Sequence, residues 1–186
     1  MFGLMVLVSF LGGIKLIVGI QGGLGSGKTL LMARYLVKDF WSGRNVHANF
    51  GLKKIEFTPL DMNDLLNKSV DLQDVSIGID EFTVFADCRT SMSNKMITYF
   101  ILQTRKRNVC LYYTTQDFGM LDKRILRHTH LFITADKIEG DEDFRLYTVI
   151  DARDRIAKPH EFVLRINPWF EYFDTNEIIE PLGLNE

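Results

Sequence analysis

The amino-acid sequence predicts an α/β fold, with a mainly parallel central sheet flanked by helices and additional antiparallel strands toward the C-terminus. In the first two thirds of the chain, apolar runs with strand character alternate with stretches whose apolar residues recur at helical spacing. After residue 131, strand-like runs follow one another with little helix between them. The 186 residues, 46% of them hydrophobic, suffice for one substantial core, so we expect a single domain over residues 1–186.

The first twenty residues are strongly apolar, and Lys15 is the only charge among them. One alternative is a membrane anchor or signal peptide, because about 20 apolar residues in a helix cross a bilayer. However, Gly12 and Gly13 interrupt the run and no basic residue precedes Lys15. These features favour two strands, at residues 5–10 and 15–21, and we expect no stable membrane insertion.

The remaining elements follow from periodicity and from the residues that end each run. Apolar residues at helical spacing predict helices at residues 28–41, 59–66 (capped near Thr58), 93–106 and 121–127. Apolar or β-branched runs predict strands at residues 45–49, 75–79, 109–115, 131–135, 144–150 and 162–166. The run at 75–79 is almost wholly apolar, which is typical of a parallel strand buried on both faces.

A glycine-rich motif, Gly-Gly-Leu-Gly-Ser-Gly-Lys-Thr, lies between the second strand and the first helix. This GxxxxGK[ST] pattern binds nucleotide phosphates through successive backbone N–H groups, whereas a plain glycine turn needs no such context. Lys28 would place a positive charge on the outer phosphates, and Thr29 would bind Mg²⁺. The expected nucleotide-binding residues are Gly22, Gly23, Leu24, Gly25, Ser26, Gly27, Lys28, Thr29 and Leu30.

Two adjacent carboxylates, Asp80 and Glu81, end the apolar strand at 75–79. Asp80 is suited to hold the water shell of the metal, and Glu81 is suited to polarise an attacking water. A kinase must exclude that water, so Glu81 favours ATP hydrolysis over phosphate transfer to a small molecule. The alternative interpretation is a solvated acidic turn after a strand.

The segment from Thr104 to Gln116 ends a helix in basic residues and then ends a strand in an amide. Gln116 is a candidate sensor of the terminal phosphate. Arg105 is a candidate catalytic arginine finger, and Arg107 is the alternative. Cations at this position also stabilise a helix C-terminus, so a purely structural role stays open for Arg105, Lys106 and Arg107.

In this order, the motifs resemble the FtsK/HerA superfamily of DNA-pumping ATPases. The Ile79-Asp-Glu-Phe segment and residues 105–132 are most similar to its viral branch, comprising genome-packaging ATPases and zonula occludens toxin-like phage assembly proteins. The resemblance covers roughly residues 15–135. It implies a RecA-like (ASCE) P-loop NTPase fold in which the strand ending at Gln116 lies between the P-loop strand and the Asp80 strand. It also implies a homo-oligomeric ring, usually a hexamer, in which an arginine reaches the nucleotide of the neighbouring subunit.

Position by position, Lys28, Thr29, Asp80, Glu81 and Gln116 fall on motif positions of the resembled family, and Arg105 falls where that family has its finger. Phe82-Thr83 departs from the Ala-His or Ala-Gln that often follows the acidic pair. A C-terminal membrane segment, common in toxin-like assembly ATPases, is not visible, which favours packaging into a capsid over extrusion through a membrane.

DNA contacts must come from a local patch or from an assembled ring, because the formal net charge is only −2. Lys123, Arg124 and Arg127 follow Gln116 and would face the centre of a ring, which implies short-range coupling to the nucleotide. An ordinary solvated helix face is the alternative for this cluster. Lys95 and Arg89 are comparable candidates.

The expected function is therefore an ATP-hydrolysing DNA translocase with ATP and Mg²⁺ as cofactors, most simply a viral genome-packaging motor. Its expected partners are double-stranded DNA, copies of itself, and capsid vertex or portal proteins, and its expected location is the cytoplasm. A toxin-like assembly ATPase at a membrane and a P-loop nucleotide kinase or switch are the alternatives. The aromatic segment at 167–177 is expected to pack on the core or on a subunit, with adenine stacking as the alternative.

Overall fold

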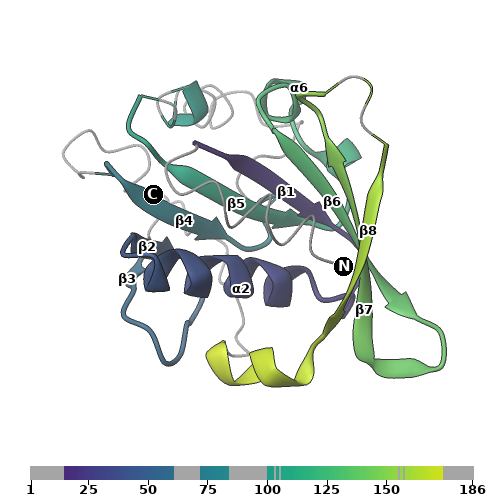
Figure 1. Ribbon diagram of the computed structural model, residues 1–186. Coiled ribbons are helices and arrows are strands. Elements are labelled where there is room, and N and C mark those ends of the chain that lie inside the picture. Colours follow the sequence, from purple (N-terminus) through teal and green to yellow (C-terminus); the bar gives the residue numbers. More distant parts are fainter. Residues whose placement is uncertain are drawn as a thin grey trace, which may run out of the picture.

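A single sheet organises the molecule, in a computed structural model that describes residues 15–60, 72–83, 100–102, 104, 106–154, 156 and 158–173. Within these ranges it has eight strands in the order β3-β2-β4-β5-β1-β6-β7-β8 (Figure 1). Strands β3 to β6 are parallel, and β7 and β8 are added antiparallel. The strands are β1 (Ile17–Gln21), β2 (Asn45–Ala48), β3 (Thr58–Pro59), β4 (Val75–Ile79), β5 (Cys110–Thr115), β6 (Leu131–Ile138), β7 (Asp141–Asp151) and β8 (His160–Arg165).

The described helices are α2 (Lys28–Trp41) and the short α6 (Lys123–Leu126), accompanied by two 3-10 segments, η1 (Phe118–Met120) and η2 (Asn167–Tyr172). Helix α2 and strand β4 have the predicted bounds. The predicted helix cap at Thr58 is wrong, because Thr58 and Pro59 pair with β2 as an edge strand, where a proline without N–H is tolerated. The predicted strand at 5–10, residues 61–66 and most of the helix at 93–106 lie outside the described residues.

Strand β5 lies between β1 and β4, which confirms the predicted strand order. All three strands are parallel and almost wholly buried, as their apolar composition requires. The chain segments that leave their carboxyl ends therefore meet at one edge of the sheet. These segments are the P-loop after β1, the acidic pair after β4 and Gln116 after β5.

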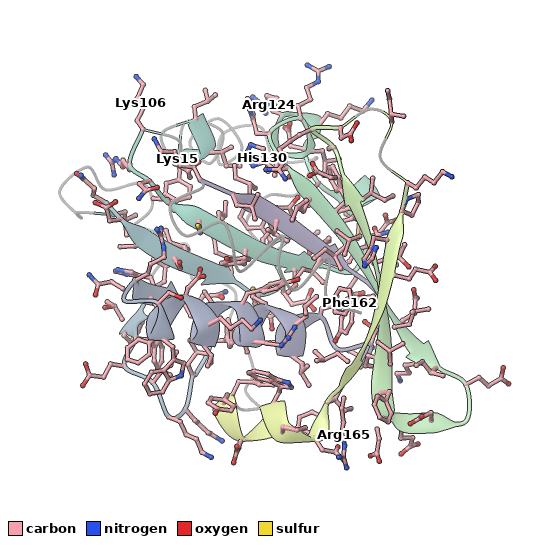
Figure 2. The ribbon with its side chains drawn as sticks, in the orientation of Figure 1. Lys15, Lys106, Arg124, His130, Phe162 and Arg165 are labelled. Carbon is pink, nitrogen blue, oxygen red and sulfur yellow. The ribbon has the colours of Figure 1, made fainter. Side chains whose placement is uncertain are left out.

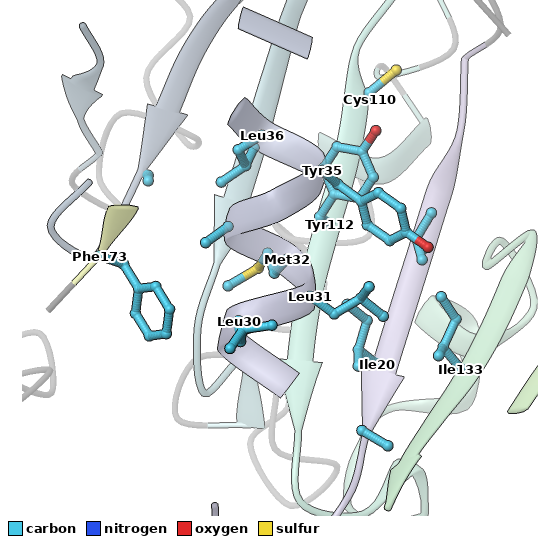
Figure 3. Close-up of a cluster of buried hydrophobic side chains, with 14 of the residues drawn as sticks. Ile20, Leu30, Leu31, Met32, Tyr35, Leu36, Cys110, Tyr112, Ile133 and Phe173 are labelled. Carbon is cyan, nitrogen blue, oxygen red and sulfur yellow. The ribbon is translucent and has the colours of Figure 1, made fainter. Parts of the chain in front are cut away.

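Two hydrophobic clusters cover the two faces of the sheet. Helix α2 lies along one face (Figure 1), and its buried residues Leu31, Met32 and Leu36 join the first cluster. In that cluster the rings of Tyr35 and Tyr112 stack with centroids 5.4 Å apart (Figure 3). The second cluster includes residues of β4 and β5, together with Phe82 and Ile125, so α6 packs against the face opposite α2.

The aromatic segment at the end of the described chain packs against α2. Trp169 is partly buried against the first cluster. The Arg34 guanidinium lies over its ring, 5.3 Å from the ring centroid. Phe173 is buried and forms a bridge with Leu52. These contacts support the packing interpretation of residues 167–173. Among the described residues, no helix combines the length and apolarity that crossing a membrane requires.

Candidate functional site

The P-loop adopts a conformation that only glycine accommodates easily. Gly25 and Gly27 have positive φ angles of 71° and 95°, and Gly27 is the N-cap of α2. No side chain caps this helix end and no acidic residue lies in its first turn. The first N–H groups of α2, with the positive end of its dipole, are thus directed at the loop, as in sites that bind phosphate.

Two polar groups in the loop fit a bound phosphate chain. The Lys28 side chain is buried, and its Nζ donates to the Gly23 carbonyl at 3.1 Å across the loop. The Ser26 hydroxyl is buried and has no hydrogen-bond partner among the described residues. Burying a cation beside a neutral carbonyl costs free energy, and so does burying a hydroxyl without a hydrogen-bond partner. An anion bound in the loop would offset both costs.

Thr29 and Asp80 meet at the base of the loop. The Thr29 hydroxyl lies 3.1 and 3.0 Å from the two carboxylate oxygens of Asp80, and Thr114 donates a second hydroxyl to the same carboxylate. Burial raises the pKa of Asp80, and the hydrogen bonds from Thr114 and Thr29 oppose this shift. One hydroxyl and one or two carboxylates are the usual protein ligands of Mg²⁺ in phosphate sites, so the pair fits that ion.

Glu81 and Gln116 lie together beside this pair. The Gln116 side chain lies close enough to the Glu81 carboxylate to lower its pKa. Burial and the adjacent Asp80 carboxylate raise the pKa of Glu81, whereas Lys28 and Gln116 lower it. A carboxylate with a raised pKa is a better proton acceptor than an exposed one, which suits a group that polarises water.

Glu81 has a strained backbone that its neighbours hold in place. Its φ angle is 49°, which is uncommon for a residue with a side chain. Its N–H donates to the Thr114 hydroxyl at 3.0 Å, and the next N–H, of Phe82, donates to the Thr114 carbonyl at 2.9 Å. Phe82 is buried against Tyr113. Phe82, which departs from the pattern of the resembled family, therefore anchors the acidic pair in the core.

Asn49, which sequence reasoning missed, holds the acidic pair from the other side. Its side-chain oxygen accepts from the Asp80 N–H at 2.7 Å, and its side-chain nitrogen donates to the Asp80 carbonyl at 3.1 Å. Asn49 follows β2, the neighbour of β4. A polar residue at the end of a strand is the only signal in the sequence, and it acquires meaning once β2 and β4 are known to be adjacent.

Candidate catalytic Arg105 lies outside the described residues, as do Arg89 and Lys95. The basic cluster of α6 lies away from the nucleotide loop. His130, just after α6, contacts Ile17 at the start of β1 through two hydrogen bonds. Its imidazole Nδ1 accepts from the Ile17 N–H, and its backbone N–H donates to the Ile17 carbonyl. Figure 2 shows Arg124 at the same end of the sheet as Lys15 and His130. The length of β1 thus lies between this cluster and the P-loop, and the expected coupling to the nucleotide stays a prediction.

Within that cluster the three side chains differ. The Arg124 guanidinium forms an ion pair with Asp122 at 2.6 Å, and this contact lowers the pKa of Asp122 to about 2. Lys123 and Arg127 are exposed. The charge of Arg124 is thus balanced within its own helix cap, whereas those of Lys123 and Arg127 face solvent.

No protein-family model matches the chain, and no curated protein sequence matches it. Several solved structures are similar to the chain. The N-terminal domain of zonular occludens toxin from Neisseria meningitidis has a TM-score of 0.66 at 17% identity, over 86% of this chain and 98% of that domain. The genome packaging NTPase B204 from Sulfolobus turreted icosahedral virus 2, in complex with sulfate, has a TM-score of 0.59 at 14% identity, over 80% and 97%.

A third similar structure is the flagellar accessory protein FlaH from Methanocaldococcus jannaschii, with a TM-score of 0.56 at 12% identity, over 85% of this chain and 88% of that one. The first two neighbours represent the two groups that the sequence resembles. At such identities the similarity shows the fold. The chain therefore has the P-loop NTPase fold, with a mainly parallel sheet and antiparallel strands toward its C-terminus.

Proposed function

We propose that the protein hydrolyses ATP and uses the energy to move double-stranded DNA, as the packaging motor of a viral genome. One observation carries the enzymatic part of this proposal. Thr29, Asp80, Glu81 and Gln116 converge at the carboxyl ends of three adjacent parallel strands, immediately beside the P-loop. The motor part rests on the resemblance in sequence and on the fold shared with a protein described as a DNA-packaging ATPase.

In the proposed reaction, the P-loop N–H groups and Lys28 hold the triphosphate. Thr29 and Asp80 would hold Mg²⁺, which supplies charge neutralisation on the phosphate oxygens when bound. Glu81 accepts a hydrogen bond from a water and directs its oxygen at the terminal phosphorus. The water oxygen bonds to that phosphorus as the bond from the phosphorus to the bridging oxygen breaks, and the proton of the water passes through Glu81 to the phosphate, which yields ADP and inorganic phosphate. Gln116 lies beside the Glu81 carboxylate and positions it.

The proposed DNA-binding surface lies at the end of the sheet opposite the nucleotide. Lys123 and Arg127 are exposed there, and Figure 2 shows Lys15 and Lys106 at the same end as Arg124. Exposed lysines and arginines attract phosphates without reading sequence, as a packaging motor requires. A ring of identical subunits, proposed as a hexamer, would repeat this surface around a central channel.

The test is the ATPase rate of the purified protein with and without duplex DNA, together with its solution mass. We expect hydrolysis that Glu81→Gln abolishes while ATP binding is retained, and that duplex DNA stimulates. Lys123→Ala with Arg127→Ala should remove the stimulation and leave the basal rate. Arg105→Ala should lower turnover without weakening binding if Arg105 is the finger. A monomer whose ATPase ignores DNA would contradict the motor proposal, and the absence of any hydrolysis would contradict the enzyme.

A second candidate is an assembly ATPase that acts at a membrane, as in the toxin-like group. The observation that favours it is the TM-score of 0.66 with the toxin domain, against 0.59 for the packaging NTPase. Flotation of the expressed full chain with liposomes separates the two candidates. Flotation with vesicles supports the membrane-linked role, and recovery in the soluble fraction with DNA-stimulated hydrolysis supports the motor.

A further inference from the structure

We propose that Lys137 and Arg145, on the hairpin formed by β6 and β7, bind the phosphate chain of the nucleotide held by the P-loop of the same subunit. This inference rests on the proposed nucleotide binding and adds two cations to that site. Neither residue belongs to the motifs recognised in the sequence.

The hairpin lies directly against the P-loop. A Cβ atom at Gly22 would lie 2.4 Å from the Ala135 carbonyl oxygen, and the Tyr147 hydroxyl donates to the Gly27 carbonyl at 3.0 Å. Ala135 and Tyr147 are cross-strand partners in the β6–β7 ladder. The pair formed by these two residues therefore supports the loop at both its ends.

The next pair on the same face of the ladder is Lys137 with Arg145. The Arg145 Nε donates to the Gly25 carbonyl at 3.4 Å. A Cβ atom at Gly25 would lie 3.2 Å from the Lys137 Nζ, so this ammonium reaches the middle of the loop. Both cations thus approach the segment whose N–H groups surround a phosphate chain in P-loops.

The charges of the two residues point to an anionic ligand. Like charges on directly opposite residues of an antiparallel pair repel each other. Within the described part of the chain, the structure records no ion pair for either cation. Backbone carbonyls of Glu142 and Phe144 accept from the Arg145 Nη1 at 2.9 and 2.7 Å, which fixes the guanidinium without neutralising it.

Lys137 has the properties of a ligand-binding residue and no evident structural task. It is exposed, and no hydrogen bond to its ammonium is recorded among the described residues. The loop is already held by Tyr147 and Arg145. A triphosphate in the loop would place several negative charges near the Lys137 ammonium and would relieve its repulsion with Arg145.

The experiment measures the affinities of the full chain for ATPγS, ADP and AMP in the presence of Mg²⁺, by isothermal titration. We expect Lys137→Ala to weaken ATPγS binding about 10-fold, ADP binding less, and AMP binding not at all, because the lost charge acts on the outer phosphates, which AMP lacks. Lys137→Arg should restore most of the affinity. Lys158→Ala, an exposed lysine on the connection after β7, is the matched control and should bind all three nucleotides as the unsubstituted protein does.

Three outcomes overturn the proposal in distinguishable ways. Unchanged ATPγS affinity in Lys137→Ala shows that the ammonium does not touch the phosphates. Equal weakening of ATPγS and AMP, or no recovery in Lys137→Arg, shows that Lys137 only shapes the loop. Failure of the unsubstituted protein to bind ATPγS or ADP overturns the proposed nucleotide function itself, and with it this inference.

Discussion

At the scale of single residues, the acidic pair is positioned by two side chains that have no chemical role of their own. Thr114 holds Asp80 and Glu81 from β5, and Asn49 holds the Asp80 backbone from the end of β2. The positive φ of Glu81 persists because the groups on both sides are fixed in this way. The direction of the Glu81 carboxylate therefore depends on the two neighbouring strands.

Replacing Asn49 tests this positioning role. Asn49→Ala removes both hydrogen bonds to the Asp80 backbone, so we expect a loss of about 1–2 kcal/mol in unfolding free energy. We expect turnover to fall roughly 10-fold while ATPγS affinity stays unchanged, because misplacement of Glu81 affects the transition state. Denaturation and steady-state kinetics measure the two effects. Asn45→Ala, at the exposed start of the same strand, is the control, and equal turnover in both variants would contradict the role.

Asp39 is a carboxylate at the far end of α2 that the proposed chemistry does not use. It accepts hydrogen bonds from the Ser76 and Tyr112 hydroxyls at 2.6 and 2.9 Å. Burial raises the pKa of Asp39, and these hydrogen bonds, with Arg44 and Lys38, oppose the shift. The folded protein therefore binds this proton more tightly than the unfolded chain does. Its contribution to stability is complete below the ordinary carboxyl pKa of about 4 and is lost as pH rises through the raised pKa.

Asp39→Asn removes this titration. We expect the unfolding free energy of the variant to decline less than that of the unsubstituted protein as the pH rises above about 4. Urea denaturation at a series of pH values measures the difference in slope. Glu139→Gln, an exposed residue of the β6–β7 connection, is the control and should leave the slope unchanged. Parallel curves for Asp39→Asn and the unsubstituted protein would refute the expected pH dependence.

At the scale of elements, helix α2 connects the phosphate loop to the core. It begins at Gly27, whose positive φ turns the chain from the loop into the helix, and it ends before Gly43, which also has a positive φ. The two glycines differ in their surroundings. A Cβ atom at Gly27 would lie 2.7 Å from the Tyr147 hydroxyl, whereas a Cβ atom at Gly43 would have nothing within 4 Å. Gly27 is therefore required both by its backbone angle and by the contact with β7.

The pair of variants Gly27→Ala and Gly43→Ala separates these two requirements. Gly43→Ala incurs only the backbone strain, for which we expect a loss of about 1–2 kcal/mol in unfolding free energy. Gly27→Ala adds the clash with Tyr147, so its loss should reach roughly 3 kcal/mol and nucleotide binding should weaken as well. Chemical denaturation and ATPγS titration measure both effects. Equal losses in the two variants would show that the loop does not depend on its contact with β7.

Sequence periodicity predicted helices and strands best where one face of the element is buried, because burial requires apolar residues at regular spacing. The bounds of α2 and β4 followed from apolar spacing, because β4 is buried throughout and α2 packs one face on the core up to Val37. Strands β6 and β7 extend well beyond the predicted 131–135 and 144–150. Their added residues are largely charged, and backbone pairing in the hairpin holds them as strand without an apolar signal.

The residues of the candidate site also divide into those that the sequence predicted and those that it did not. Lys28, Asp80, Glu81 and Gln116 were recognisable because each ends a strand or begins a helix in a motif of known spacing. Asn49 and Lys137 were not, because their contacts depend on which strands are neighbours and on the register of the β6–β7 pair. Strand order and register are properties of the folded sheet, so the sequence does not display them directly.

At the scale of the whole molecule, the proposed nucleotide site and the basic end are separated by the length of β1, about 13 Å for its five residues. One contact system joins the nucleotide end to the segment that leads to α6. The Gln21 side chain donates to the Thr134 hydroxyl at 3.4 Å and accepts from the Phe118 N–H at 3.1 Å. Strands β1, β5 and β6, which run side by side, and these contacts of Gln21 connect the two ends.

The nucleotide site also joins the two hydrophobic clusters, so ligand binding should stabilise the whole fold. The hydrogen bonds from Thr29 to Asp80 connect α2, which packs in the first cluster, to the end of β4, which packs in the second. A ligand bound only by the folded state at 100 times its dissociation constant adds about 2.7 kcal/mol to the unfolding free energy. For a domain of this size, that corresponds to a rise in Tm of roughly 5–10 °C.

We therefore expect saturating Mg²⁺ and ATPγS to shift the thermal transition of the unsubstituted protein as one cooperative unit, by this amount. Lys28→Ala should lose most of the shift, because its ammonium no longer meets the phosphates. Chelation of Mg²⁺ should reduce the shift in the unsubstituted protein, since the Asp80 carboxylate then faces the phosphates without a cation between them. Differential scanning calorimetry measures all three conditions. If only part of the transition moved with ligand, the two clusters would be unfolding independently, and the junction at Thr29 and Asp80 would not connect them energetically.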